Sequence, residues 1–244
     1  MKYLNDNAET SGYRTTTGDF DAKKSSMRKF GGILSVLTGV VFFVTALAFF
    51  LLPPEQQNFT ATSEFFKSVV ANPTVLKLTF LGSMIGAILA IGAVIAVAGH
   101  MRRINEALVC WSSTLAIIAY AVSAVGNATD LIRIPDLAAR YVQGDVSIRT
   151  AIEAGDLGSI DPSLILQSIL LGLWFFLVNF LALRSRTLPR PLTWIGLIFG
   201  VGSILSFPFI LLNMQFLLLV TRVLGLIIIS PVWFIGTGIV LIRK

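Results

Sequence analysis

The sequence has few of the residues from which soluble enzymes build their sites. Its 244 residues include one cysteine and one histidine, and only 13% of them are charged. A single cysteine excludes a disulfide framework and a cysteine-based metal cluster, and a single histidine excludes a multi-histidine zinc site or bis-histidine haem. Soluble domains average about 25% charged residues, so an ordinary cytosolic enzyme is excluded too. Disordered chains need low hydrophobicity, whereas 55% of this chain is hydrophobic.

Long apolar runs account for that hydrophobic fraction. A helix needs about 20 consecutive apolar residues to cross the hydrocarbon core of a bilayer, and the runs are too long and too free of alternation for strands. We therefore predict an all-α fold, a polytopic transmembrane bundle of six spans. The predicted spans cover residues 31–52, 75–98, 108–125, 162–183, 191–212 and 216–242.

The positions of the basic residues predict the orientation of these spans. Thirteen of the 19 Lys and Arg residues lie before the first span, in the second-to-third and fourth-to-fifth connections, and at the C-terminus. The positive-inside rule places these segments in the cytoplasm, so both termini are expected inside. The net charge of +6 then reports topology, and a nucleic-acid partner is not expected.

The segments outside the predicted spans differ in character. Residues 1–27 are predicted to be a polar cytoplasmic tail, followed by a six-helix domain over 28–244. In the first outer loop, Thr62 or Ser63 can cap a short amphipathic helix, which we expect to lie on the outer membrane interface. Residues 126–161 are expected to form an outer cap with two more amphipathic helices, the first starting at Pro135.

Small residues and prolines inside the spans predict how the helices pack. Two GxxxG pairs allow close backbone approach, either within the bundle or across a homodimer. Pro208 and Pro231 are expected to kink the fifth and sixth spans, which either shapes the bundle or opens a cavity. The candidate packing residues are Gly82, Gly86, Gly196 and Gly200.

Polar residues at depth are the only candidates for a site. No Asp or Glu lies within a predicted span core, and Arg222 is the one deep cation. We expect Arg222 either to pair with an acid or amide of the protein or to hold an anionic headgroup or solute. The candidate outer polar pocket consists of Arg222, Gln167, Asn213, Lys77 and Asp161.

Three stretches of the sequence carry a resemblance to a known family. Residues 28–34 open the first span with a basic and glycine-rich segment, residues 180–190 form a basic turn after the fourth span, and residues 231–243 form a glycine-containing C-terminal helix. Together they resemble a bacterial six-helix integral-membrane family named only as a domain of unknown function. The resemblance implies a six-helix architecture in a prokaryotic plasma membrane. It implies no activity, cofactor or catalytic residue.

These observations favour a non-catalytic membrane protein. We expect an accessory, scaffold or regulatory component that binds protein or lipid, with membrane lipids, a protein partner or a second copy of the chain as its partners. The alternative is a small transporter or a membrane protein that binds a lipophile or an anionic solute. No catalytic residues, cofactor or metal site are expected, because no nucleotide-binding, metalloprotease or serine-hydrolase motif is present.

Overall fold

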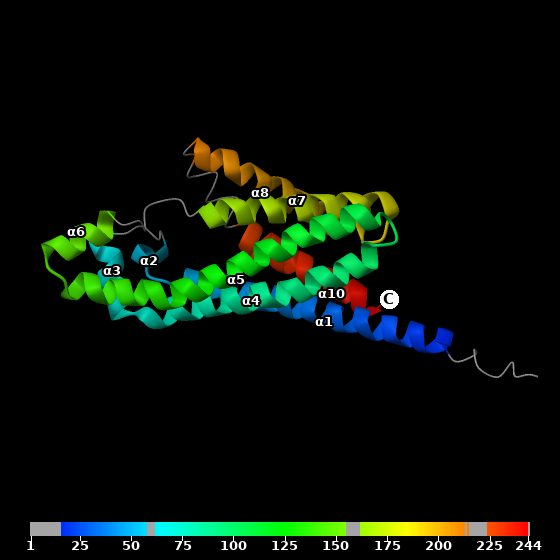
Figure 1. Ribbon diagram of the computed structural model, residues 1–244, viewed down its shortest axis with the longest axis horizontal. Coiled ribbons are helices and arrows are strands. Elements are labelled where there is room, and N and C mark those ends of the chain that lie inside the picture. The colour runs from blue at the N-terminus through cyan, green and yellow to red at the C-terminus, as the bar shows by residue number, and fades with distance from the viewer. Residues whose placement is uncertain (1–15, 58–61, 155–161, 213, 215–223, 244) are drawn as a thin grey trace, which may run out of the picture.

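The computed structural model describes residues 16–57, 62–154, 162–212, 214 and 224–243, and every regular element in these ranges is a helix. The predicted all-α class is therefore confirmed. Figure 1 shows the helices as an elongated bundle. They are α1 (Thr16–Phe50), α2 (Pro54–Gln57), α3 (Ser63–Ala71), α4 (Pro73–Met101), α5 (Glu106–Gln143), α6 (Val146–Ala154), α7 (Pro162–Ser185), α8 (Arg190–Leu211), the π-helix η1 (Leu224–Ile229) and α10 (Ser230–Arg243).

Five of these helices are long and apolar enough to cross a membrane. They comprise Ser26–Phe50, Pro73–Met101, Glu106–Gln143, Ile165–Ser185 and Arg190–Pro208, as expected of a multi-pass membrane protein. The sixth predicted segment is described only from Leu224 onward, as η1 followed directly by the short apolar helix α10. Pro231 lies at this junction, and its missing N–H explains why the preceding turn is wider than an α-helix.

Each long helix packs mainly on one or two neighbours. The first helix, α1, lies between α4 and α10, while α5 packs on α4, α7 on α5, and α8 on α7. Helices α8 and α10 also contact each other, but less extensively than the pairs named above. The first and last helices approach especially closely, because a Cβ atom on Gly32 would lie 2.9 Å from the carbonyl oxygen of Gly238.

The core of the bundle is aromatic. Trp174 and Phe175 of α7 and Trp233 and Phe234 of α10 are fully buried, and the indole rings of Trp174 and Trp233 meet edge to face at 5.5 Å. Such edge-to-face pairs add to the energy of burial alone. This core holds α7 and α10 together near the middle of the bundle.

The outer cap is built around a continuation of α5. This helix runs without a break to Gln143, about 27 Å beyond residue 125 at 1.5 Å per residue. The prediction that a separate helix starts at Pro135 is wrong, because Pro135 lies inside α5. Proline removes only its own N–H from the helix, and the helix on both sides of it is stabilised by packing on α3.

The short helix α3 packs its apolar face on other helices of the chain. Thr62 caps it by accepting a hydrogen bond from the Phe65 N–H at 3.1 Å, as expected from the sequence. Its Phe65 and Phe66 side chains are buried in a second core that contains Ile134 and Tyr141 of α5. The apolar face that the sequence predicts to contact the membrane interface is therefore covered by the protein itself.

The N-terminal segment is also partly helical. α1 begins at Thr16, within the range 1–27 that the sequence predicts as a polar tail. Residues 1–15 lie outside the described ranges.

Candidate functional site

The predicted outer polar pocket falls largely on residues that the structure does not describe. Arg222, Asn213 and Asp161 are among these. Of the other two, Gln167 lies half-buried on α7 and Lys77 lies exposed on α4, and no hydrogen bond joins them. The outer pocket therefore stays a prediction.

The predicted packing glycines each face another helix of the same chain. A Cβ on Gly82 would meet Thr45 of α1 and one on Gly86 would meet Phe42 of α1. On α8, Gly196 faces Asn179 of α7, and Gly200 faces the α7 backbone. These faces are thus occupied within the bundle.

Asn179 and Trp233 form a buried polar contact between α7 and α10. The indole Nε1–H of Trp233 donates a hydrogen bond to Oδ1 of Asn179 at 2.9 Å, and the Asn179 side-chain N–H donates to the carbonyl of Phe175 at 2.8 Å. Both side chains are fully buried. Gly196 of α8 completes the contact, since any Cβ there would lie 2.1 Å from Nδ2 of Asn179.

The sequence alone indicates that Asn179 has a hydrogen-bond partner, but not which one. An amide within an apolar span needs a partner because burying it unpaired is costly. The pattern does not say which of the other helices supplies that partner. Here Trp233 does so from the far end of the chain.

Three further polar atoms in the bundle core are buried without a hydrogen-bond partner in the structure as described. They are Ser113 Oγ of α5, Trp174 Nε1 of α7 and Thr237 Oγ1 of α10. Buried groups of this kind are normally satisfied by protein or by ordered water. Three polar atoms therefore lie within an otherwise apolar core.

The outer cap is held together by its own contacts. Tyr141 of α5 stacks on Phe66 of α3 at 4.4 Å and donates its hydroxyl proton to the carboxylate of Glu153 on α6. Arg149 of α6 donates to the Tyr141 carbonyl oxygen at 3.2 Å and lies over the Tyr141 ring at 5.8 Å. Tyr141 therefore joins α3, α5 and α6.

Helix α6 presents an exposed surface at the tip of the cap. Asp145 caps it by accepting hydrogen bonds from the Ile148 N–H at 3.0 Å and the Ser147 hydroxyl at 2.7 Å. The Ile148 bond, followed by the Ser147 bond, lowers the pKa of Asp145 from its ordinary value. No residue of α6 is buried, and Val146 is 78% exposed.

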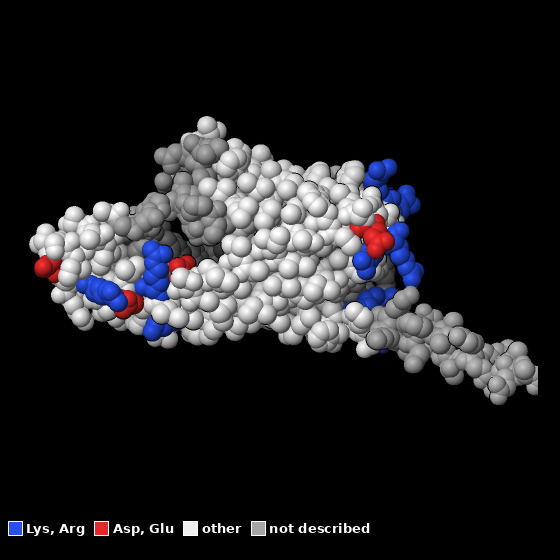
Figure 2. Space-filling model, viewed as in Figure 1, with Lys and Arg blue, Asp and Glu red and all other residues white. Residues whose placement is uncertain are grey.

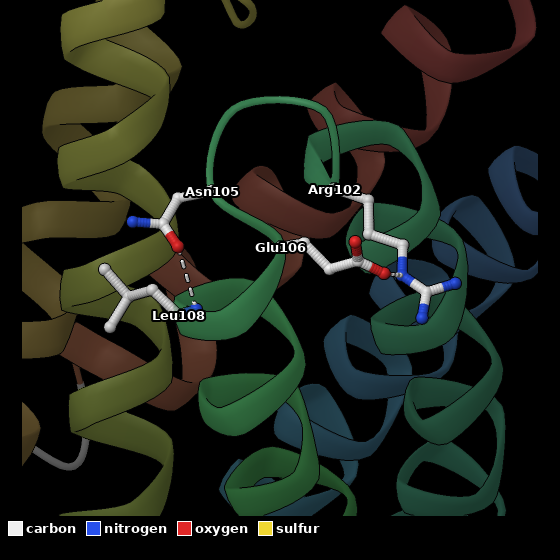
Figure 3. A network of polar contacts seen from close by, with 4 residues as sticks. All are labelled: Arg102, Asn105, Glu106 and Leu108. Carbon is white, nitrogen blue, oxygen red and sulfur yellow. Dashed lines mark hydrogen bonds and ion pairs between the residues drawn. The ribbon is translucent and has the colours of Figure 1, made fainter.

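The opposite end of the bundle is basic. Arg102 and Glu106 form an ion pair at 3.1 Å across the turn between α4 and α5, and the Asn105 side chain caps α5 by accepting from the Leu108 N–H at 3.0 Å (Figure 3). Lys and Arg side chains gather at this end of the space-filling view, on the right, and a broad uncharged band separates them from the cap (Figure 2). This band has the character of a membrane-crossing surface.

Comparison with protein families identifies the kind of chain to which this architecture belongs. Residues 32–244 match the family described as "Domain of unknown function (DUF4386)". The chain belongs to this family. The predicted resemblance to a family known only as a domain of unknown function is thereby confirmed. Comparisons with curated proteins and with solved structures found no match.

The described part of this DUF4386 chain offers no grouping of three or more His, Cys, Asp or Glu side chains that could hold a metal ion. Its one cysteine, Cys110, is a free, half-buried thiol on α5. The polar features that the structure brings together are thus the Asn179–Trp233 contact, the outer cap and the basic turns.

Proposed function

We propose that this protein is a non-catalytic integral membrane component that binds a partner protein through its outer cap. The observation that carries the proposal is the construction of the cap. Helix α5 extends far beyond the length needed to cross a bilayer, and α3 and α6 are fixed to this extension by Tyr141. Recognition surfaces are typically held on such rigid supports.

The composition of the cap supports a protein as its partner. The exposed tip combines apolar side chains, including Val146 and Ile148, with the charged groups Asp145 and Arg149. A mixed apolar and polar surface is typical of protein interfaces. The absence of acidic residues from the predicted span cores supports a role without catalysis or proton transport.

The proposal includes the finer topology. We place six spans in a prokaryotic plasma membrane, with both termini in the cytoplasm and the cap outside. The basic turns at one end of the bundle support this orientation through the positive-inside rule. The sixth span would consist of the segment that ends in η1 and α10.

One observation favours an alternative function. The last helix is interrupted by η1 just before Pro231, and interrupted spans are a feature of many transporters. A small transporter or a protein that binds a lipophile or an anionic solute is therefore the second candidate. Uptake into vesicles would follow from this alternative and not from the first.

Site-specific photo-crosslinking in the native membrane tests the main proposal. Photoreactive residues at Val146 and Ile148 should each give an adduct with the same discrete protein. Val40, which is exposed on α1 within the predicted first span, is the matched control and should label lipid. A second test replaces Phe66 with Ala, which removes the ring stacked on Tyr141 and should weaken the cap adduct. Only lipid labelling at Val146 and Ile148 would refute the proposal.

A further inference from the structure

The turn between α7 and α8 concentrates positive charge without an anion of its own. Arg184, Arg186 and Arg190 are all exposed, and none of the three forms an ion pair with any residue that the structure describes. Arg102, in the turn between α4 and α5, differs because it pairs with Glu106. Mutual repulsion among three unpaired guanidinium groups favours the binding of an anion.

A second basic turn lies against the first. The hydroxyl of Thr187 donates to Sδ of Met101 at 3.2 Å, which joins the α7–α8 turn to the end of α4. Arg102 and Arg103 follow Met101 directly and are exposed. Figure 2 shows basic side chains gathered at the end of the molecule where both turns lie.

The local geometry already positions one of the arginines. The Arg184 guanidinium lies over the ring of Phe180 at 5.8 Å, and Phe180 stacks on Phe176 at 6.1 Å. This contact holds Arg184 at the boundary between the basic turn and the apolar surface of α7. Arg186 has a left-handed backbone, with φ of 56°, and the chain reverses direction there to enter α8.

We propose that the α7–α8 turn binds the phosphate headgroup of an anionic phospholipid through Arg184, Arg186 and Arg190. Guanidinium groups suit this ligand because each can donate two parallel hydrogen bonds to phosphate oxygens. Basic clusters on the cytoplasmic side of transmembrane helices are a recognised setting for anionic headgroups. This site is separate from the outer cap and does not depend on the partner proposed for it.

The surface next to the arginines explains why the ligand is a lipid rather than free phosphate. Phe180 on α7 and Trp194 and Ile198 on α8 are exposed large apolar side chains, and Trp194 is 55% exposed. Trp194 lies about one helical turn from Arg190. A headgroup at the turn therefore has an apolar surface beside it on which its acyl chains can pack.

The test uses the full-length protein purified in detergent and native mass spectrometry. The probes are phosphatidylglycerol and phosphatidylcholine with the same acyl chains. The test variant is Arg186→Gly with Arg190→Gln. Glycine tolerates the left-handed backbone at position 186 and glutamine is a good helix former, so this variant should fold. The matched control is Lys29→Gln with Arg243→Gln, which removes two exposed charges from α1 and α10.

The wild type should bind phosphatidylglycerol in preference to phosphatidylcholine. The test variant should lose about twenty-five-fold in apparent affinity for phosphatidylglycerol, or about fivefold per arginine. The control should stay within about twofold, since neither residue belongs to the α7–α8 turn and exposed charges outside a site are weakened by salt screening. Equal losses in the test and control variants would overturn the proposal, because they would show only a general attraction to positive charge.

Two further comparisons test whether the ligand is a lipid and whether guanidinium groups bind it. Inorganic phosphate and glycerophosphoglycerol, which lacks acyl chains, should not displace phosphatidylglycerol at equal concentration. Displacement by either would overturn the assignment to a lipid. Arg186→Lys with Arg190→Lys keeps both charges but loses the paired donors and should fall between the wild type and the test variant. If this variant binds phosphatidylglycerol as tightly as the wild type, the proposed role of the paired guanidinium donors is wrong.

Discussion

Asn179 lies where α7, α8 and α10 meet. Its amide uses the carbonyl oxygen for Trp233 and the N–H for Phe175, while Gly196 leaves room for it. In a bilayer, helices gain little from burying apolar side chains against one another, because lipid is equally apolar. A hydrogen bond and a close contact at one residue therefore contribute much of the specificity of this helix arrangement.

A double-mutant cycle measures that hydrogen bond. Asn179→Ala and Trp233→Phe should each lower the free energy of unfolding, and the coupling between them should be about 0.6–1.7 kcal/mol, the range for hydrogen bonds between membrane helices. Unfolding of the purified protein in mixed micelles provides the measurement. Strictly additive effects of the two substitutions would show that the bond contributes nothing.

Two glycines on α8 give a matched test of close packing. Gly196→Ala places a methyl group against Asn179, whose side chain cannot move away without breaking its bond to Trp233. We expect a loss of about 1–3 kcal/mol in stability, as for other overpacked sites.

Gly202 is the control on the same helix, because a Cβ there would meet no atom within 4 Å. Gly202→Ala should leave stability unchanged or raise it by up to about 1 kcal/mol through helix propensity. Thermal unfolding of the two variants side by side is sufficient. A larger loss for Gly202→Ala would contradict the packing described here.

At the scale of elements, most helices can be predicted from the sequence. The sequence does not show that α5 continues through Pro135. Apolar runs reveal the long helices, since no other element satisfies its backbone within a membrane. The prediction at Pro135 is wrong because local rules favour a helix start at proline. In the structure, packing of Ile134 and Tyr141 on α3 keeps α5 continuous. The partners of Asn179 and Gly196 are set by tertiary contacts that no local pattern contains.

Asp145, the residue that caps the N-terminus of α6, leads to a prediction about pH. Hydrogen bonds from Ile148 and Ser147 lower the pKa of Asp145 in the folded state. Its contribution to α6 is therefore fully present above the ordinary Asp value of about 3.9. That contribution is lost as the pH falls through the lowered folded pKa.

Amide hydrogen exchange in α6, corrected for the intrinsic pH dependence, should show this loss of protection in acid. Asp145→Asn is the matched control, since asparagine also caps helices but does not titrate in this range. In this variant, protection of the α6 amides should not decrease as the pH is lowered, because residue 145 no longer titrates. An identical acid response in the two proteins would exclude Asp145 as its origin.

For the whole molecule, composition and charge predict a number and a direction of spans, whereas they do not predict the order of helices around the bundle. On α1 and α4 the exposed residues are as apolar as the buried ones, so the sequence does not show which face of each helix packs on a neighbour. Of the predicted outer pocket, Gln167 and Lys77 alone fall on described residues, so the pocket itself stays a prediction. The basic turns, in contrast, are readable directly from the sequence.

Cysteine accessibility tests the orientation. In a background that carries Cys110→Ala, an introduced thiol at Gln143 should react with a membrane-impermeant reagent from outside. A thiol at Ser185 should react only after the membrane is opened. Both positions are exposed in the structure, so burial does not limit labelling. Reaction of both thiols from the same side would refute the six-span arrangement.

The pairing of α1 with α10 imposes an order on biosynthesis. The hydroxyl of Ser35 donates to the carbonyl of Phe234 at 2.7 Å, across 199 positions of the chain. At about 5–20 residues per second, a ribosome needs about 10–40 s to make the intervening chain. Throughout that interval the glycine-lined face of α1, including Gly32 and Gly39, lacks its final partner. The α1–α10 contact is therefore among the last to form, and a truncated nascent chain leaves this face of α1 open to lipid or to the insertion machinery.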